Sequence, residues 1–127
     1  YYSGPENYFD LGVLYKYNRN PKNNKEYYLW LSNELLNYKS RLSLIRLGDF
    51  SRYHLNDYSK AYKWYYICSK IELENKNWDK NLFGGWQINY INECSENIIF
   101  LEKNILSKKD VSKTIFESKN WIKKYIK

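Results

Sequence analysis

The only histidine of the chain, His54, is the first residue to consider for catalysis or metal binding. Acid–base and metal chemistry need a histidine beside a carboxylate, a nucleophile or further ligands. Here His54 is followed by Leu55, Asn56 and Asp57, a composition typical of a helix end and a turn. We therefore interpret His54 as a cationic or turn residue near a helix C-terminus, where positive charge is favoured.

A pair of carboxylates and a pair of glycines are the next candidates for a site. Glu93 and Glu96 lie three residues apart, which on a helix predicts one solvated face. Gly84 and Gly85 lack the Gly-Lys-Ser ending of a phosphate-binding loop. The sequence contains no nucleophile elbow, zinc-ligand spacing or nucleotide fingerprint. It therefore predicts a protein that is not an enzyme and that uses no metal or cofactor.

Two cysteines, Cys68 and Cys94, are too few for a disulfide framework. Cys68 falls at a small-residue position of a predicted helix, where a thiol packs as a compact apolar group. A bridge would require the two helices that carry the cysteines to touch, which their spacing does not establish. We expect both residues to be structural thiols.

Length, composition and charge predict one folded domain that would favour acidic partners. The chain has 127 residues, enough for a core, and its 43% apolar content excludes a disordered class. No run of eighteen apolar residues is present, so no membrane span is predicted. A net charge of +7 favours acidic partners, or only reflects lysines that cover the outer helix faces. With no signal peptide at its start, we expect a cytoplasmic location, or a periplasmic one if the N-terminus is processed.

Apolar residues recur at helical spacing along most of the chain. Ala61, Trp64 and Ile67 follow the three-and-four spacing of one helix face. Asp57 and Ser107 are suited to be the N-caps of the helices that follow them. The predicted helices cover residues 5–17, 27–38, 40–53, 57–74, 82–106 and 111–126, with a loop at 18–24.

A repeat is visible in the glycines and tryptophans. Gly12, Gly48 and Gly84 recur every 36 residues, and Trp30 and Trp64 are 34 apart. Repeats of this length are typical of helical hairpins that stack into one core. The sequence predicts an all-α single domain over residues 1–127, a short right-handed superhelical stack of antiparallel hairpins, or α-solenoid, with about six helices. Its units would be 6–38, 41–74 and 80–106, closed by a helix at 108–126.

The repeat-defining residues carry a resemblance to a known family. They are Leu11, Gly12, Leu14 and Tyr15 in the first unit, and Leu47, Gly48, Phe50, Asp57, Lys60, Ala61, Trp64, Tyr65, Cys68 and Ser69 in the second. This pattern resembles the Sel-like repeat (SLR), a tetratricopeptide-repeat-like helical hairpin, over residues 6 to about 70. The sequence departs from the pattern at Tyr27, which stands where the second unit has Ala61, and at Glu34, which stands opposite Cys68. Ser51 replaces the tyrosine of the pattern.

The SLR resemblance implies a protein–protein interaction module. Small bacterial SLR proteins are often accessory partners, and some act as immunity proteins that bind and neutralise a secreted toxin. An alternative function is that of a basic, tyrosine-rich nucleic-acid-binding helical protein, whose exposed tyrosines would stack on bases.

The resemblance also implies a binding surface, because the first helix of each unit lines the concave side of such stacks. Placed through the Leu-Gly step, the predicted partner-binding residues are Lys16, Tyr17, Asp49, Arg52, Tyr53, Asn81 and Asn89. Two cations with two tyrosines would suit an acidic, partly apolar protein surface, since tyrosine and arginine are enriched among binding hot spots. The alternative is that these are ordinary solvated residues and that a partner uses the convex face or a helix end.

Overall fold

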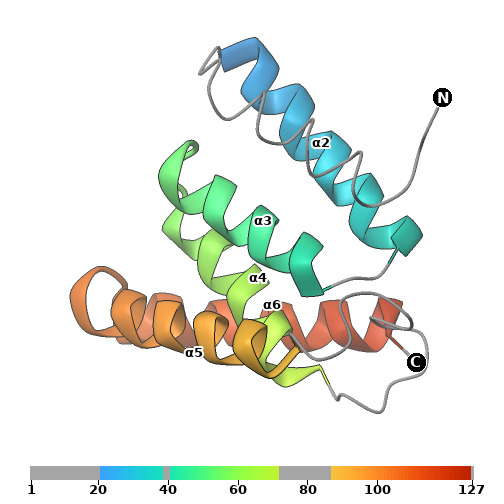
Figure 1. Cartoon of the computed structure of the whole chain (residues 1–127). Helices are drawn as coiled ribbons and strands as arrows, with labels where there is room; N and C mark the ends of the chain where they lie inside the picture. Colours follow the sequence, from blue (N-terminus) through green and yellow to red (C-terminus); the bar gives the residue numbers. More distant parts are fainter. Residues whose placement is uncertain (1–20, 39–40, 72–86, 127) are drawn as a thin grey trace, which may run out of the picture.

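The computed structural model describes residues 21–38, 41–71 and 87–126, and all regular structure in them is α-helical. The helices are α2 (Pro21–Tyr38), α3 (Arg41–Tyr53), α4 (Tyr58–Lys70), α5 (Gln87–Asn104) and α6 (Lys108–Tyr125), as Figure 1 shows. The prediction of an all-α fold is confirmed for this part of the chain. The helix predicted at 5–17 lies outside the described residues.

Helix α4 is the central element and packs against α3, α5 and α6, while α2 packs on α3. Figure 1 shows α2, α3 and α4 side by side, with α5 and α6 crossing beneath them. Contacts between α3 and α4 run in opposite order along the two helices. Arg41 at the start of α3 meets Ile71 just past α4, and Gly48 meets Tyr65 in the middle. The two helices therefore form an antiparallel hairpin.

The turn between α3 and α4 is built from short polar side chains. Asn56 adopts a positive φ of 53°, a conformation that asparagine tolerates better than most residues. Asp57 follows as the N-cap of α4, and its side chain accepts from the backbone N–H of Lys60 at 3.1 Å. The backbone N–H of Asp57 donates to the carbonyl of Ser51 at 2.9 Å. The predicted cap at Asp57 is confirmed.

Helix α2 begins earlier than predicted, whereas α6 begins where the closing helix was predicted at 108–126. Helix α2 starts at Pro21, so the loop predicted at 18–24 is wrong from that residue onward. Proline suits a first helical position, because its fixed φ is already helical and its missing N–H would have no partner there. Helix α6 starts at Lys108, where Ser107 is the N-cap and accepts from the backbone N–H of Asp110 at 3.1 Å.

The core lies around α4, which is buried on more than one face. Ala61, Trp64, Ile67 and Cys68 are all buried, so the predicted face of this helix is confirmed. Tyr65 is also buried, because α4 has neighbours on several sides.

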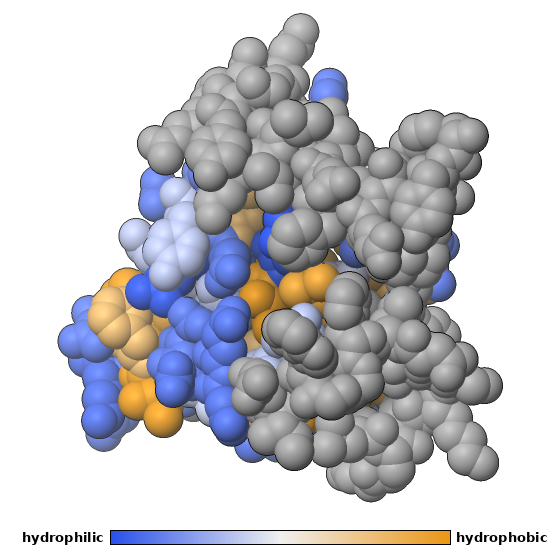
Figure 2. Space-filling model, in the orientation of Figure 1, coloured by the Kyte–Doolittle hydropathy of each residue, from blue (hydrophilic) through white to orange (hydrophobic). Residues whose placement is uncertain are grey.

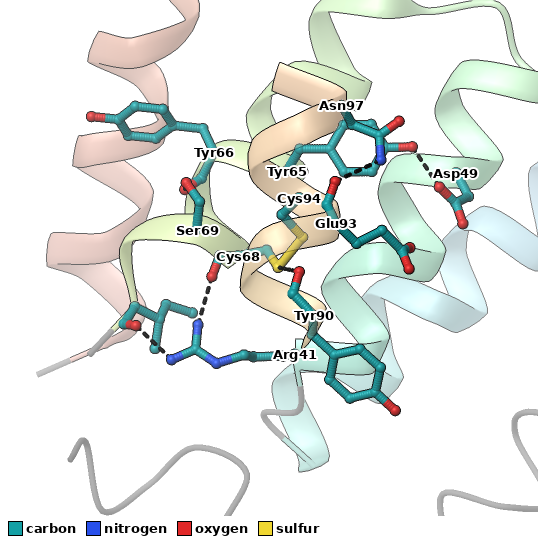
Figure 3. The surroundings of a disulfide bond; sticks show 11 residues. Arg41, Asp49, Tyr65, Tyr66, Cys68, Ser69, Tyr90, Glu93, Cys94 and Asn97 are labelled. Atoms are coloured by element: carbon teal, nitrogen blue, oxygen red, sulfur yellow. Dashed lines mark hydrogen bonds between the residues drawn. A yellow bond between two sulfur atoms is a disulfide. The ribbon is translucent and has the colours of Figure 1, made fainter. Parts of the chain in front are cut away.

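Helix α4 ends at Lys70, not at Glu74 as predicted. A buried arginine, Arg41, donates hydrogen bonds to backbone carbonyls at this end. Arg41 has no exposed surface. Its Nη1 donates to the carbonyl of Cys68 and its Nη2 to that of Ile71, each at 2.5 Å (Figure 3). The last carbonyls of a helix have no partner within the helix. The guanidinium supplies that partner, from a residue 30 positions away in the sequence.

The expectation of two free thiols is wrong, because Cys68 and Cys94 form a disulfide bond. The bond joins α4 to α5 across a Cα–Cα distance of 6.2 Å, and both residues are fully buried (Figure 3). Helices α4 and α5 are therefore in contact at these two cysteines, a contact that the sequence spacing alone did not predict. A bridge of this kind stabilises a fold mainly by restricting the unfolded chain.

Gly48 lies at a close contact between α3 and α4. A Cβ atom added there would lie 2.6 Å from Cε1 of the Tyr65 ring and 2.8 Å from its Cδ1. That ring is fully buried and its hydroxyl donates to Asp49, so it has little room to move. We expect Gly48→Leu to overpack the α3–α4 hairpin and to lower the free energy of unfolding by about 1–3 kcal/mol.

Urea denaturation checks this expectation. Asn92→Leu is the control, because Asn92 is exposed on α5 and a surface change there should alter stability by no more than about 0.5 kcal/mol. Equal midpoints for Gly48→Leu and the unmodified protein would contradict the close contact.

Candidate functional site

Three of the predicted partner-binding residues are described with their side chains, and all three lie on α3: Asp49, Arg52 and Tyr53. Lys16, Tyr17 and Asn81 lie outside the described residues. Asn89 belongs to α5, but its side chain is also outside them.

Asp49 is half-buried and contacts the neighbouring helix. Its Oδ1 accepts a hydrogen bond of 2.5 Å from the hydroxyl of Tyr65 on α4 (Figure 3). Burial and the nearby Asp49 carboxylate both raise the pKa of Tyr65, so the phenol stays protonated and remains the donor. Asp49 therefore supports the α3–α4 hairpin.

Arg52 lies where the end of α3 meets α5. Its Nη1 donates to Oδ1 of Asn97 on α5. Its guanidinium carbon lies 4.8 Å from the ring centroid of Tyr53 and 4.5 Å from that of Phe100. Both distances are within the range of a cation–π contact. We call these four residues the Arg52 cluster: Arg52, Tyr53, Asn97 and Phe100.

The Arg52 cluster is ordered by its own contacts and is accessible to solvent. The Nδ2 of Asn97 donates to the backbone carbonyl of Glu93 at 2.9 Å, which directs its Oδ1 toward Arg52. Tyr53 is 59% exposed and Phe100 is 42% exposed. Figure 2 shows an apolar patch at the carboxyl-terminal end of α5, beside hydrophilic side chains. Two rings thus hold one cation at the surface.

Sequence reasoning identified the α3 half of the Arg52 cluster and missed the α5 half. Ile98, Ile99, Phe100 and Leu101 are four consecutive apolar residues. A helix cannot bury four consecutive side chains on one stripe, so some of them must face outward. Leu101 is fully buried, whereas Ile99 is 51% exposed. That run was the signal for an exposed apolar surface on α5.

A small pocket adjoins the Arg52 cluster and shares Tyr53 with it. Tyr27 of α2, His54 just after α3 and four residues of α3 line it: Arg46, Asp49, Phe50 and Tyr53. The Phe50 ring contacts two other rings of the pocket. The Tyr27 ring meets the Phe50 ring edge-on at a centroid distance of 4.6 Å, and the His54 ring stacks on it at 5.1 Å. A cation, a carboxylate and an imidazole thus line one opening, which suits a small polar group carried by a larger ligand.

The described residues contain no cluster of three or more histidine, cysteine, aspartate or glutamate side chains placed to hold a metal ion. None of the described helices combines the length and apolar character needed to cross a membrane. No family model, curated protein or solved structure matches the chain.

Proposed function

We propose that this chain is a non-catalytic protein–protein interaction module of the SLR type, a short right-handed superhelical stack of helical hairpins that binds a protein with an acidic surface. The observation that carries the proposal is the Arg52 cluster. An arginine and a tyrosine of this kind are the residue types that dominate binding energy in protein interfaces. Asn97 and the two rings hold the arginine in place, which lowers the entropy lost on binding.

The chemistry of the site fits a carboxylate-bearing, partly apolar partner surface. A guanidinium held against two rings presents its remaining donors at its edge, where a carboxylate can accept them. Ile99 of α5 and Ile105, the residue that follows α5, are exposed and would extend the contact with apolar area. In the SLR family such partners include secreted toxins, and we propose an accessory or immunity role on that analogy.

The disulfide indicates the kind of compartment in which the protein functions. Disulfides persist in oxidising compartments and are rare in a reducing cytoplasm. The Cys68–Cys94 bond therefore supports a periplasmic, secreted or comparable location over a cytoplasmic one.

The test is affinity capture from an extract of the native organism, followed by binding measurements with the purified captured protein. We expect Arg52→Ala combined with Phe100→Ala to weaken binding by about 30-fold, equivalent to about 2 kcal/mol. The matched control is Lys25→Ala combined with Leu29→Ala, which removes one exposed cation and one exposed apolar side chain from α2.

Two results would overturn the proposal. One is a cluster variant that keeps its fold by circular dichroism and binds the partner within about twofold of the unmodified protein. The other is a captured ligand that is RNA, with an affinity for mixed RNA that falls steeply with salt, because phosphate contacts release counterions.

A further inference from the structure

Helix α6 carries a strongly cationic outer face that the proposed function does not use. The helix has six lysines and two carboxylates, and all six lysines are exposed: Lys108, Lys109, Lys113, Lys119, Lys123 and Lys124. The two carboxylates, Asp110 and Glu117, are exposed as well, and the six lysines against two carboxylates leave the helix with an excess of positive charge. Glu117 interacts with Lys63 of α4, and Asp110 lies in the first helical turn, where negative charge is favoured. The excess positive charge of α6 therefore lies on its solvent-exposed side.

An exposed aromatic ring lies in the middle of this face. Phe116 is 66% exposed. The spacing from Lys109 to Lys113, Phe116 and Lys123 is four, three and seven residues, which places all four side chains on one side of the helix. The opposite side, with the buried Thr114, packs toward the core. The lysines therefore form a line about 21 Å long with a ring between them.

We propose that this face of α6 binds a linear anionic polysaccharide, such as a sulfated glycan. A line of cations matches a chain that carries one negative group after another. The C–H bonds on one face of a sugar ring are weakly positive, and they pack on the negative face of an aromatic ring such as Phe116. Lysine-rich patches are a general means of binding polymers of this kind.

The disulfide favours this ligand over the other common polyanions. The Cys68–Cys94 bond is typical of an oxidising compartment, where nucleic acids are scarce and polysaccharides are abundant. Anionic lipids are concentrated on the cytoplasmic leaflet of membranes. A helix that enters a lipid surface must also present its apolar side, and α6 packs that side against the core.

Heparin oligosaccharide of defined length is the probe, and calorimetric titration of the whole chain at two salt concentrations is the measurement. We expect Lys113→Gln combined with Lys123→Gln to weaken binding by about tenfold, because two of the aligned charges are lost. Phe116→Ala should weaken it by about threefold with the net charge unchanged, because one stacking contact is lost.

The control is Lys25→Gln combined with Lys103→Gln, which removes two exposed charges from α2 and α5. Binding by this control within about twofold of the unmodified protein supports the α6 site. Equal weakening by both pairs would overturn it, because the effect would then come from net charge alone. Tighter binding to mixed RNA, or to phosphatidylserine vesicles, than to heparin would overturn the choice of a polysaccharide.

Discussion

Replacing Arg41 by methionine should lower the free energy of unfolding by about 3–5 kcal/mol, because two buried carbonyls each lose a charged hydrogen-bond donor worth about 1.5–3 kcal/mol. Arg41 is fully buried and donates to the carbonyls of Cys68 and Ile71 at 2.5 Å each. Methionine fills a similar volume without donating a hydrogen bond. Two buried acceptors at the end of α4 would then be unsatisfied, at about 1–3 kcal/mol each.

Urea denaturation followed by circular dichroism measures the effect of Arg41→Met. Lys103→Met is the matched control, because Lys103 is a cation exposed in the last turn of α5. Arg41→Lys should fall between the two, since an ammonium lacks the planar fork that reaches two carbonyls at once. A midpoint for Arg41→Met equal to that of the control would show that the guanidinium does not stabilise the end of α4.

Removing the Trp64 side chain should cost about 3–5 kcal/mol, the range for large aromatic residues in a core. Trp64 is 5% exposed and connects three helices. From α4 its Nε1 donates to the hydroxyl of Tyr28 on α2 at 3.2 Å, and its ring meets that of Trp121 on α6 edge-on at 5.5 Å. Such a loss is a large part of the 5–15 kcal/mol that usually stabilises a domain.

Thermal unfolding of Trp64→Ala and Trp64→Phe tests this role. Phenylalanine keeps most of the buried apolar area and loses the hydrogen bond to Tyr28, so it should destabilise the protein much less than alanine. If Trp64→Ala has the same melting temperature as the unmodified protein but no longer binds a partner, Trp64 belongs to an interface and not to the core.

The amino-acid sequence by itself determined the helical fold and several of its local features. Asp57 and Ser107 cap helices as predicted, because a cap depends on a side chain and on backbone groups three residues away. The buried face of α4 follows from the spacing of Ala61, Trp64 and Ile67. These interactions lie within one or two helical turns, so local residue types were sufficient to predict them.

Only the tertiary structure decided which distant residues meet. Helix α4 ends four residues before the predicted position, where Arg41 donates to its last carbonyls, and Cys68 bonds to Cys94, 26 residues away. Arg52 was predicted from the repeat, but its contacts with Asn97 and Phe100 depend on how α5 crosses α3. The physical reason is that a helical period defines which side of a helix is apolar, but not which neighbour covers it. That choice follows from the packing of all helices together.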